Sequence, residues 1–379
     1  MIRLGFGVTT LSRGAAGKGI DGIGAYTREL GRALAADGDM GLTTVSFGAH
    51  QAADLIPNAE TLELGRFPPR ALLSELMPVS YAGSGPLQRR IDLFHATDHL
   101  VPRLRRVPVV ATVMDAIPIS HPEWISGQRL RSQKAWLWRR TTRRATAIVT
   151  ISEHSRREIV RHFDVSPDAV SVIPLGVDDR FHEEVGADER IAVCRRHGLP
   201  SDFFLFVGTL QPRKNLARVI QAHRALPASM RSACPLVVVG RPGWQCDDVV
   251  NELEALSREG TGKWLRYLPD RDLRALMQSA RALVFPSLHE GFGLPVLEAF
   301  ASGLPVITSD TTALPEVAGD AAALVDPADT GQIAAAMTRV VEDDDWADTL
   351  RERGRGRVRL FSWKTCARRT MNLYERILG

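Results

Sequence analysis

The sequence of 379 residues has no apolar run approaching the roughly 18 residues of a membrane-spanning helix, so we expect no transmembrane segment. No long apolar region follows the first residues, MIRLGFGV, which therefore predict a β-strand rather than a signal peptide. Cysteines are few and scattered, with no Cys-x-x-Cys pair: Cys194, Cys234, Cys246 and Cys366. Such cysteines are typical of small core side chains in a reducing compartment, so the sequence predicts a cytoplasmic protein without structural disulfides.

The net charge is only +4, but basic residues gather in one segment that has no acidic residue. This segment, between Arg129 and Arg144, carries seven lysines and arginines and also Trp136 and Trp138. Such a mixture suits anionic lipid headgroups, where each basic residue contributes ~1 kcal/mol, and it equally suits a solvated helix face. No nucleic-acid-binding motif accompanies the charge, so we expect no nucleic-acid partner.

Short apolar runs alternate with helical stretches along the whole chain. The runs that predict strands are 2–8, 42–47, 92–96, 108–113 and 147–152, then 203–208, 236–240, 264–268, 282–286 and 305–308. Unbroken apolar runs are typical of buried parallel strands, and helices between them make right-handed βαβ units. The pattern predicts two doubly wound, parallel-sheet α/β domains.

The domain boundary is expected near residues 176–186, after the segment VIPLGVDDRF. We therefore expect an N-terminal domain over residues 1–180 and a second domain over 181–361. Residues 362–379 have the spacing of an amphipathic helix.

The most informative segment is HEGFGLPVLEAFASGLPVI, residues 289–307. Glu290 lies in a loop, Gly291 and Gly293 follow it, and Pro295 suits the first position of a helix. The start of a helix presents free N–H groups and the positive end of the helix dipole, which together favour a phosphate group. The glycines allow close approach of that phosphate, and Glu298, expected in the first turn, is placed to accept hydrogen bonds from ribose hydroxyls.

A second glycine-rich sequence leaves an alternative open. Residues Gly17 to Gly22 match the Gly-x-Gly-x-x-Gly fingerprint of dinucleotide-binding oxidoreductases. The first strand, however, ends near Val8, whereas the fingerprint belongs in the turn directly after a strand. Lys18 also lacks the following Ser or Thr and the upstream glycine spacing of a P-loop. An oxidoreductase is therefore a remote alternative.

Glu290 and Glu298, separated by seven residues within EGFGLPVLEA, resemble the signature of the retaining glycosyltransferases of family 4, which have the GT-B fold. The resemblance covers nearly the whole chain. VGTLQPRKNL (207–216) is similar to the family's phosphate-binding loop, VIPLGVD (172–178) to its interdomain hinge, and Gly22–Ile23–Gly24 to its N-terminal glycine loop. It implies two Rossmann-like domains facing a cleft, the first for the acceptor and the second for a nucleotide sugar, with 362–379 packing on the first.

The resemblance also implies roles for individual residues. Arg213 and Lys214 would hold the donor diphosphate and stabilise the leaving group, and with Glu290 and Asp115 they form the predicted catalytic set. The implied donor-binding residues are Gly22, Gly24, Gly208, Arg213, Lys214, Gly240, Tyr267, Leu268, Glu290, Gly291, Phe292, Gly293, Leu294 and Glu298.

One position departs from the family pattern. In VVATVMDAIPISHPEW, Met114 stands where a histidine usually precedes the aspartate, here Asp115. That histidine normally contacts the donor sugar, so its replacement puts the contact in doubt. His95, His99 or Asp115 are candidate substitutes, and His95, Met114 and Asp115 form the expected acceptor side.

The implied chemistry is front-face transfer with retention, in which the acceptor proton passes to the leaving phosphate. It requires no protein nucleophile and no cofactor. The sequence Asp37–Gly38–Asp39 has the Asp-x-Asp form of some metal sites but reads as the turn after a helix, so we expect no metal. By resemblance to bacterial mannosyltransferases we expect GDP-mannose as donor, with UDP-sugars as the alternative, and a glycan or lipid-linked saccharide as acceptor. Peripheral binding to the inner membrane face is the accompanying hypothesis. A catalytically weak nucleotide-sugar-binding subunit of a glycan assembly complex is the alternative.

Overall fold

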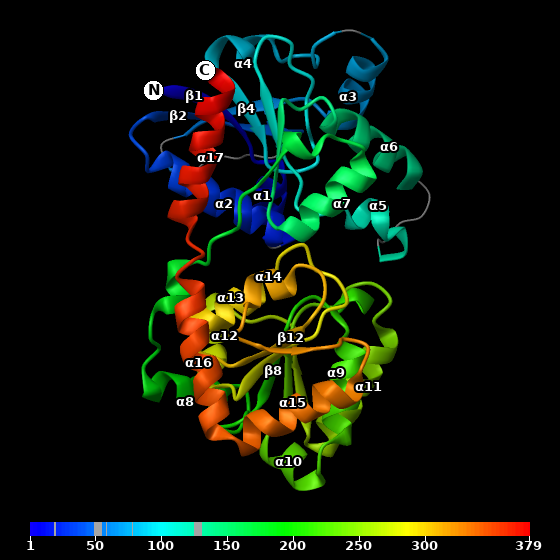
Figure 1. Ribbon diagram of the computed structural model, residues 1–379, viewed down its shortest axis with the longest axis vertical. Helices are drawn as coiled ribbons and strands as arrows, with labels where there is room; N and C mark the ends of the chain where they lie inside the picture. Colours follow the sequence, from blue (N-terminus) through cyan, green and yellow to red (C-terminus); the bar gives the residue numbers. More distant parts are fainter. Residues whose placement is uncertain (19, 49–54, 58, 78, 125–130) are drawn as a thin grey trace. The chain divides into compact units, whose positions relative to one another are not determined.

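The computed structural model describes residues 1–379 except 19, 49–54, 58, 78 and 125–130; of residues 17, 18 and 131–134 it describes the backbone alone. The chain divides into two compact units (Figure 1). Unit 1 comprises Met1–Gly176 and Trp363–Gly379, and unit 2 comprises Val177–Ser362. The chain therefore leaves unit 1 once and returns to it for its last helix. At the start and end of unit 2, Val177 N donates to Phe361 O and Val177 forms a β-bridge with Ser362.

Unit 1 is built on a parallel sheet in the order β3-β2-β1-β4-β5-β6-β7. Its strands are β1 (Ile2–Gly7), β2 (Met40–Phe47), β3 (Glu60–Leu64), β4 (Leu93–Ala96), β5 (Val109–Thr112), β6 (Ala147–Thr150) and β7 (Val170–Val172). Its helices of four or more residues are α1 (Thr9–Arg13), α2 (Gly22–Ala35), α3 (Phe67–Leu76), α4 (Gly85–Arg90), α5 (Ile117–Ser120), α6 (Arg131–Thr142), α7 (Glu153–Phe163) and α17 (Trp363–Leu378), with a π-turn over Gly14–Lys18.

The two faces of this sheet are covered by different helices. Phe94 and Ala111 pack in one cluster with Phe67 of α3 and Leu87 of α4. Because side chains alternate along a strand, the neighbouring His95 of β4 points to the opposite face. There it meets Tyr374 of α17, which lies beside α2 (Figure 1). The predicted return of the last helix to the first domain is confirmed.

Unit 2 repeats the same topology with the order β10-β9-β8-β11-β12-β13. Its strands are β8 (Phe204–Val207), β9 (Leu236–Val239), β10 (Gly262–Leu265), β11 (Ala282–Phe285), β12 (Val306–Ser309) and β13 (Ala323–Val325). Its helices of five or more residues are α8 (Ala187–Arg196), α9 (Leu216–Ala225), α10 (Ala228–Ala233), α11 (Asp247–Glu259), α12 (Asp270–Ser279), α13 (Leu294–Ala301), α14 (Leu314–Ala318), α15 (Thr330–Glu342) and α16 (Asp344–Val358).

In unit 2 the strand order reverses between β8 and β11. The chain runs outward from β8 to β9 and β10 on one side, then returns to build β11, β12 and β13 on the other. In open parallel sheets the loops at such a reversal diverge and leave a crevice at the carboxyl ends of the strands. The loops after β8 and β11 are therefore the place to look for a ligand site.

The predicted class, α/β with two doubly wound parallel sheets, is confirmed, and three strands were missed. β3, β7 and β13 are edge strands of three to five residues whose side chains are partly exposed, so they lack the unbroken apolar run that marks a central strand. The strand expected at 264–268 is β10, which ends at Leu265. Among the described residues, no helix has the length and apolar character needed to cross a membrane.

Candidate functional site

Two glycines hold the loop after β8 against the end of β9. Gly208 has φ +153° and donates its N–H to Val239 O. A Cβ at Gly240 would lie only 1.9 Å from Gly208 O, so Gly240 has no room for a side chain. The backbone of this loop is therefore closely constrained up to the short 3₁₀ turn Pro212–Lys214.

Asn215 fixes the end of that turn. Its backbone is left-handed, with φ 61°, and its buried amide Nδ2 donates to Pro286 O at 2.8 Å and to Pro327 O at 2.7 Å. One side chain thus joins the loop after β8 to the loops after β11 and β13. Sequence reasoning missed Asn215, although Asn tolerates left-handed backbone better than most residues and stands directly after two cations.

Glu290, from the loop after β11, meets both predicted cations. Lys214 Nζ lies 2.6 Å from Glu290 Oε1, and Arg213 Nη1 lies 2.8 Å from Oε2. Glu290 is 7% exposed, and burial alone would raise its pKa, but the charges of Lys214 and Arg213 and their hydrogen bonds outweigh that effect and lower the pKa to about 2. The carboxylate is therefore ionised throughout the physiological pH range.

The two cations have further contacts that hold them at the carboxyl end of the sheet. Arg213 Nη1 also donates to His289 O, and Lys214 Nζ lies 4.7 Å from the ring centroid of Phe285. Charge-assisted hydrogen bonds from two such groups suit a diphosphate, because its oxygens accept in the same way as the Glu290 carboxylate. The sequence prediction brought these three residues to one site, and the structure places them in contact.

The helix after Glu290 begins where the glycines predicted it. Gly293 is the N-cap of α13 with φ +126°, and a Cβ there would lie 2.8 Å from Leu314 Cδ2. Pro295 stands in the first turn. Glu298, however, is the fifth residue of α13 and lies in its second turn, which corrects the expectation of a first-turn acid. The start of α13 still presents main-chain N–H groups suited to an anion.

Glu298 has an unusual ionisation for a partly buried carboxyl. Burial is the largest influence and raises its pKa, the charge of Arg180 lowers it, and Asp178 raises it again; the result is a pKa of about 7. At neutral pH a substantial fraction of Glu298 is therefore protonated, in contrast to Glu290.

Two of the implied donor-binding side chains belong to the core. Phe292 is buried and packs edge-on against Phe361, with ring centroids 5.9 Å apart. Leu268 is also buried, whereas Tyr267 is 66% exposed, with the Arg241 guanidinium 5.1 Å from its ring centroid. Donor contacts through the side chains of Phe292 and Leu268 are therefore ruled out in this conformation, which leaves their backbone atoms. Gly291 and Leu294 flank Phe292 and Gly293 in the same loop.

In unit 1, Gly22 and Gly24 lie inside the first turn of α2 and not in a loop before it. Asp21 is the N-cap residue, and its Oδ1 accepts a hydrogen bond from Gly24 N at 2.8 Å. The prediction of a glycine loop at this point is wrong, because the Asp21 side chain supplies the cap that starts the helix there. Met114 and Asp115 lie after β5, separated from it by Val113, and Asp115 Oδ1 accepts from Ile117 N at 3.0 Å.

His95 has no surface that an acceptor could reach. It is fully buried, with Nδ1 2.5 Å from Tyr374 Oη and Nε2 2.6 Å from Thr112 Oγ1, and Tyr26 Oη lies 2.8 Å from the same Thr112 hydroxyl. Burial lowers the pKa of His95 to about 3, so the ring is neutral. Its assignment to the acceptor side is corrected: His95 fastens α17 to the sheet. His99 instead packs edge-on against Trp138.

The basic segment at 129–144 does meet acidic residues, which come from elsewhere in unit 1. Arg140 and Arg144 lie 2.8 and 3.0 Å from the buried Glu75 of α3, and Arg143 pairs with Asp164. Residues 129 and 130 lie outside the described residues. Trp136 is 46% exposed, whereas Trp138 packs against Phe163.

The structure gives little support to a metal site or to a dinucleotide-binding site at Gly17–Gly22. Within the described residues no group of three or more His, Cys, Asp or Glu is arranged to hold a metal ion. Gly19 of the dinucleotide fingerprint lies outside the described residues, and β1 is followed by α1 and the π-turn before that sequence is reached.

Comparisons with known proteins agree with this architecture. Residues 20–181 match the family described as "Glycosyltransferase Family 4" and residues 195–357 match "Glycosyl transferases group 1". An O-antigen chain mannosyltransferase B of Escherichia coli is 33% identical over 285 residues, which cover 75% of this chain and 74% of that protein. A serotype-specific mannosyltransferase WbdA of the same organism is 32% identical over 62% of this chain, but the match spans only 29% of its length. A crystal structure of Anabaena HepE with UDP and glucose superposes with a TM-score of 0.75 at 16% identity, over 99% of this chain and 100% of that chain.

Proposed function

From the premise that this chain belongs to glycosyltransferase family 4, with its GT-B fold and retaining chemistry, we propose that it transfers mannose from GDP-mannose. The acceptor in this proposal is a glycan or lipid-linked saccharide of surface polysaccharide or glycolipid synthesis. The observation that carries it is the contact of Lys214 and Arg213 with Glu290 where the strand order of unit 2 reverses. Mannose is favoured because the relatives compared above are named mannosyltransferases.

In this scheme unit 2 binds the nucleotide sugar and unit 1 the acceptor. Lys214 and Arg213 bind the diphosphate and stabilise the charge that develops on it, together with N–H groups at the start of α13. The acceptor hydroxyl enters on the side from which the diphosphate leaves and passes its proton to the leaving phosphate. Chemistry of this kind needs no protein nucleophile and no metal.

The remaining assignments concern the sugar. Glu290 is placed for the sugar, and Glu298 accepts hydrogen bonds from the ribose hydroxyls. On unit 1 we propose that Asp115, Gly22 and Gly24 are the residues that face the reacting groups. Met114 stands in place of a histidine and cannot supply the hydrogen bond that a histidine ring would make. We therefore expect an altered contact with the donor sugar.

The direct test is to incubate the protein with GDP-mannose, and separately with UDP-glucose, and to measure release of the nucleoside diphosphate with and without acceptor. Release that rises with acceptor, and a product with the anomeric configuration of the donor, support the proposal. Donor binding without release under any condition would favour the alternative of a catalytically weak binding subunit. Release from UDP-glucose alone would overturn the choice of donor.

Donor affinity is expected to depend on pH through Glu298. Only the ionised carboxylate offers two full acceptors to the ribose, and its pKa of about 7 means that protonation competes with binding as the pH falls below neutrality. The dissociation constant for GDP should therefore increase by up to about tenfold per pH unit below pH 7 and level off above it. Titration calorimetry at pH 6, 7 and 8 measures this, and Glu298→Gln should bind weakly with no such slope. The same slope in Glu298→Gln would assign the titration to another group.

Peripheral membrane binding is a further part of the proposal, and we now assign its centre to α3 rather than to the basic segment 129–144. Five large apolar side chains near the end of α3 are exposed by 39% to 72%: Leu72, Leu73, Leu76, Met77 and Val79. Single exposed apolar residues are common, but a contiguous group is typical of an interaction surface.

Arginines surround this apolar group. Arg103 Nη1 donates to Ser74 O and Met77 O. Arg140 of α6 and Arg144, which follows α6, hold Glu75, and α6 contacts α3 (Figure 1). Two arginines thus share one carboxylate and a third binds main-chain carbonyls, which leaves a net positive charge among these groups beside the exposed leucines. An apolar group with a basic border is the combination that binds an anionic bilayer surface.

Leu73→Glu/Leu76→Glu is expected to reduce binding to vesicles of phosphatidylcholine and phosphatidylglycerol by at least tenfold, because it removes apolar contact and adds negative charge. Flotation of the protein with these vesicles measures the bound fraction. Leu360→Glu, at a side chain 64% exposed in unit 2, is the matched control and should float like the wild type. Equal flotation of the double variant and the wild type would exclude α3, and a wild type that stays in the soluble fraction would exclude membrane binding.

A further inference from the structure

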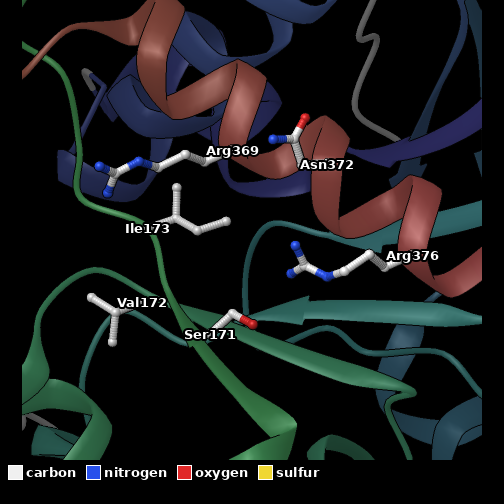
Figure 2. A pocket seen from close by; sticks show the side chains of 6 residues that line it. All are labelled: Ser171, Val172, Ile173, Arg369, Asn372 and Arg376. Carbon is white, nitrogen blue, oxygen red and sulfur yellow. The ribbon is translucent and has the colours of Figure 1, made fainter.

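A surface cavity of about 330 Å³ lies in unit 1, and none of its lining residues belongs to the predicted catalytic, donor-binding or acceptor-side sets. Two of them, Val172 and Ile173, begin the segment 172–178 that resembles the family's hinge. Three of its lining residues, Ser171, Val172 and Ile173, come from β7 and the residue that follows it. The other three, Arg369, Asn372 and Arg376, come from α17. Figure 2 shows both guanidinium groups extending from α17 toward the side on which Ser171 and Ile173 lie.

The polar side chains of this cavity can all donate hydrogen bonds, and none of them is acidic. The spacing of Arg369, Asn372 and Arg376 at i, i+3 and i+7 places them along one face of the helix, about 10 Å from first to last at 1.5 Å per residue. Across from them, Ser171 shares a sheet face with His95 and Thr112, which lie under α17, because Ser171 aligns with Val149 of β6 in the parallel register. Glu375 is adjacent in sequence but does not line the cavity.

The two arginines lack the carboxylate partner that several other arginines of this protein have. Arg140 and Arg144 are held by Glu75, and Arg180 and Arg281 by aspartates. In the part of the chain that the structure describes, neither Arg369 nor Arg376 has a carboxylate within 4.0 Å, so their charges add at the cavity without an internal counter-ion.

The edge position of β7 adds a main-chain donor. Ile173 N donates to Thr150 O of β6, and in a parallel ladder alternate residues point their N–H groups to opposite sides. The Val172 N–H therefore points away from β6, and β7 is the last strand of the sheet on this side. The cavity thus combines guanidinium, amide, hydroxyl and main-chain donors.

We propose that this cavity is a binding site for a phosphate-bearing anion, separate from the nucleotide-sugar site. The planar guanidinium forks match the geometry of phosphate oxygens, and two uncompensated positive charges match a phosphate monoester dianion. The volume admits a phosphate together with a small attached group, such as a glycerol or a sugar.

Occupation of the cavity would connect two segments that are distant in sequence. Ile173 lies shortly before Val177, where unit 2 starts, and α17 begins directly after Ser362, where unit 2 ends. An anion held by Ser171 and the two arginines therefore ties the edge strand that precedes unit 2 to the helix that follows unit 2. We expect the ligand to protect α17 against local unfolding.

The test uses the full chain with Lys214→Ala, so that phosphate binding at the candidate donor site is weakened in every sample. Glycerol 3-phosphate is titrated by calorimetry at constant ionic strength, and amide hydrogen exchange of α17 is followed in the same samples. We expect Arg369→Gln/Arg376→Gln to raise the dissociation constant at least tenfold and to remove the protection of α17. Arg368→Gln, an exposed arginine of the same helix that does not line the cavity, is the control and should bind as before.

A second arm separates a soluble phosphate ester from a lipid headgroup. Vesicles containing phosphatidic acid are compared with glycerol 3-phosphate, with Leu73→Glu/Leu76→Glu present so that α3 does not contribute. Binding in either arm that depends on both Arg369 and Arg376 supports the site and identifies the source of its ligand. Binding that is equal in the double variant and in Arg368→Gln, or no binding in either arm, would overturn the proposal.

Discussion

Lys214→Ala is expected to lower kcat by about 10²–10³-fold, which corresponds to about 2.7–4 kcal/mol of lost transition-state stabilisation. Lys214 Nζ is held 2.6 Å from Glu290 and above the Phe285 ring, so its charge is already oriented before the donor arrives. A charge fixed in this way stabilises the departing diphosphate without the cost of rearrangement during the reaction. Initial rates at saturating GDP-mannose measure the effect.

Two comparisons make the Lys214 result specific. Lys364→Ala removes an exposed lysine of α17 and should leave kcat unchanged. In Lys214→Ala, Glu290 retains Arg213 as a partner, so the thermal unfolding temperature of unit 2 should fall far less than the rate does. A variant with wild-type turnover would remove Lys214 from the mechanism, and a variant that is unfolded would be replaced by Lys214→Met, which keeps most of the side-chain volume.

Asn215→Ala is expected to destabilise unit 2 by about 2–6 kcal/mol, because it leaves the buried carbonyls of Pro286 and Pro327 without their donor at about 1–3 kcal/mol each. Alanine is also less suited than asparagine to the left-handed backbone with φ 61°. Since Asn215 ends the turn that carries Lys214, kcat/KM should fall as well. Denaturant unfolding and steady-state kinetics measure the two effects.

The parts played by the amide and the backbone can be separated. Asn215→Gly restores freedom at positive φ but still lacks the amide, so it should remain nearly as unstable as Asn215→Ala if the hydrogen bonds dominate. Asn251→Ala, at an exposed position of α11, is the matched control and should change stability by less than about 0.5 kcal/mol. Full stability in Asn215→Ala would show that neither carbonyl depends on this side chain.

The features that could be predicted from sequence are those with a local signal. The start of α13 follows from Gly293 and Pro295, whose backbone preferences act within one turn. Central strands such as β8 and β11 are unbroken apolar runs. The proximity of Lys214 and Glu290 has no local signal. It follows from the βαβ pattern, which brings the loops after β8 and β11 to one edge of the sheet.

The features that could not be predicted depend on distant partners. His95 and Tyr374 are 279 positions apart, and nothing near His95 distinguishes a buried hydrogen-bonded ring from one that faces an acceptor. Glu75 gives no local sign that it will neutralise Arg140 and Arg144. The edge strand β3 was missed because it is partly exposed and carries two glutamates. Gly22 and Gly24 were expected in a loop by resemblance to the family's N-terminal glycine loop, whereas the cap from Asp21 starts α2 at this point although glycine disfavours helices.

The contrast between Glu290 and Glu298 shows how position sets the ionisation of two like residues. Both are buried to a large extent, but only Glu290 has two cations in contact, so its pKa falls to about 2 while that of Glu298 rises to about 7. The first therefore keeps a permanent negative charge close to Lys214, and the second can exchange a proton near neutral pH. Sequence spacing alone treats the two as equivalent.

The membership of α17 in unit 1 has a consequence for how the protein is made. On the ribosome, the strands of unit 1 emerge first, but the helix that covers His95 is synthesised only after all of unit 2. Until α17 is translated, the part of the sheet face that α17 covers at His95 stays open to water or to chaperones. Nascent chains halted before residue 363 should therefore be more sensitive to protease in unit 1 than in unit 2, although unit 1 is translated earlier.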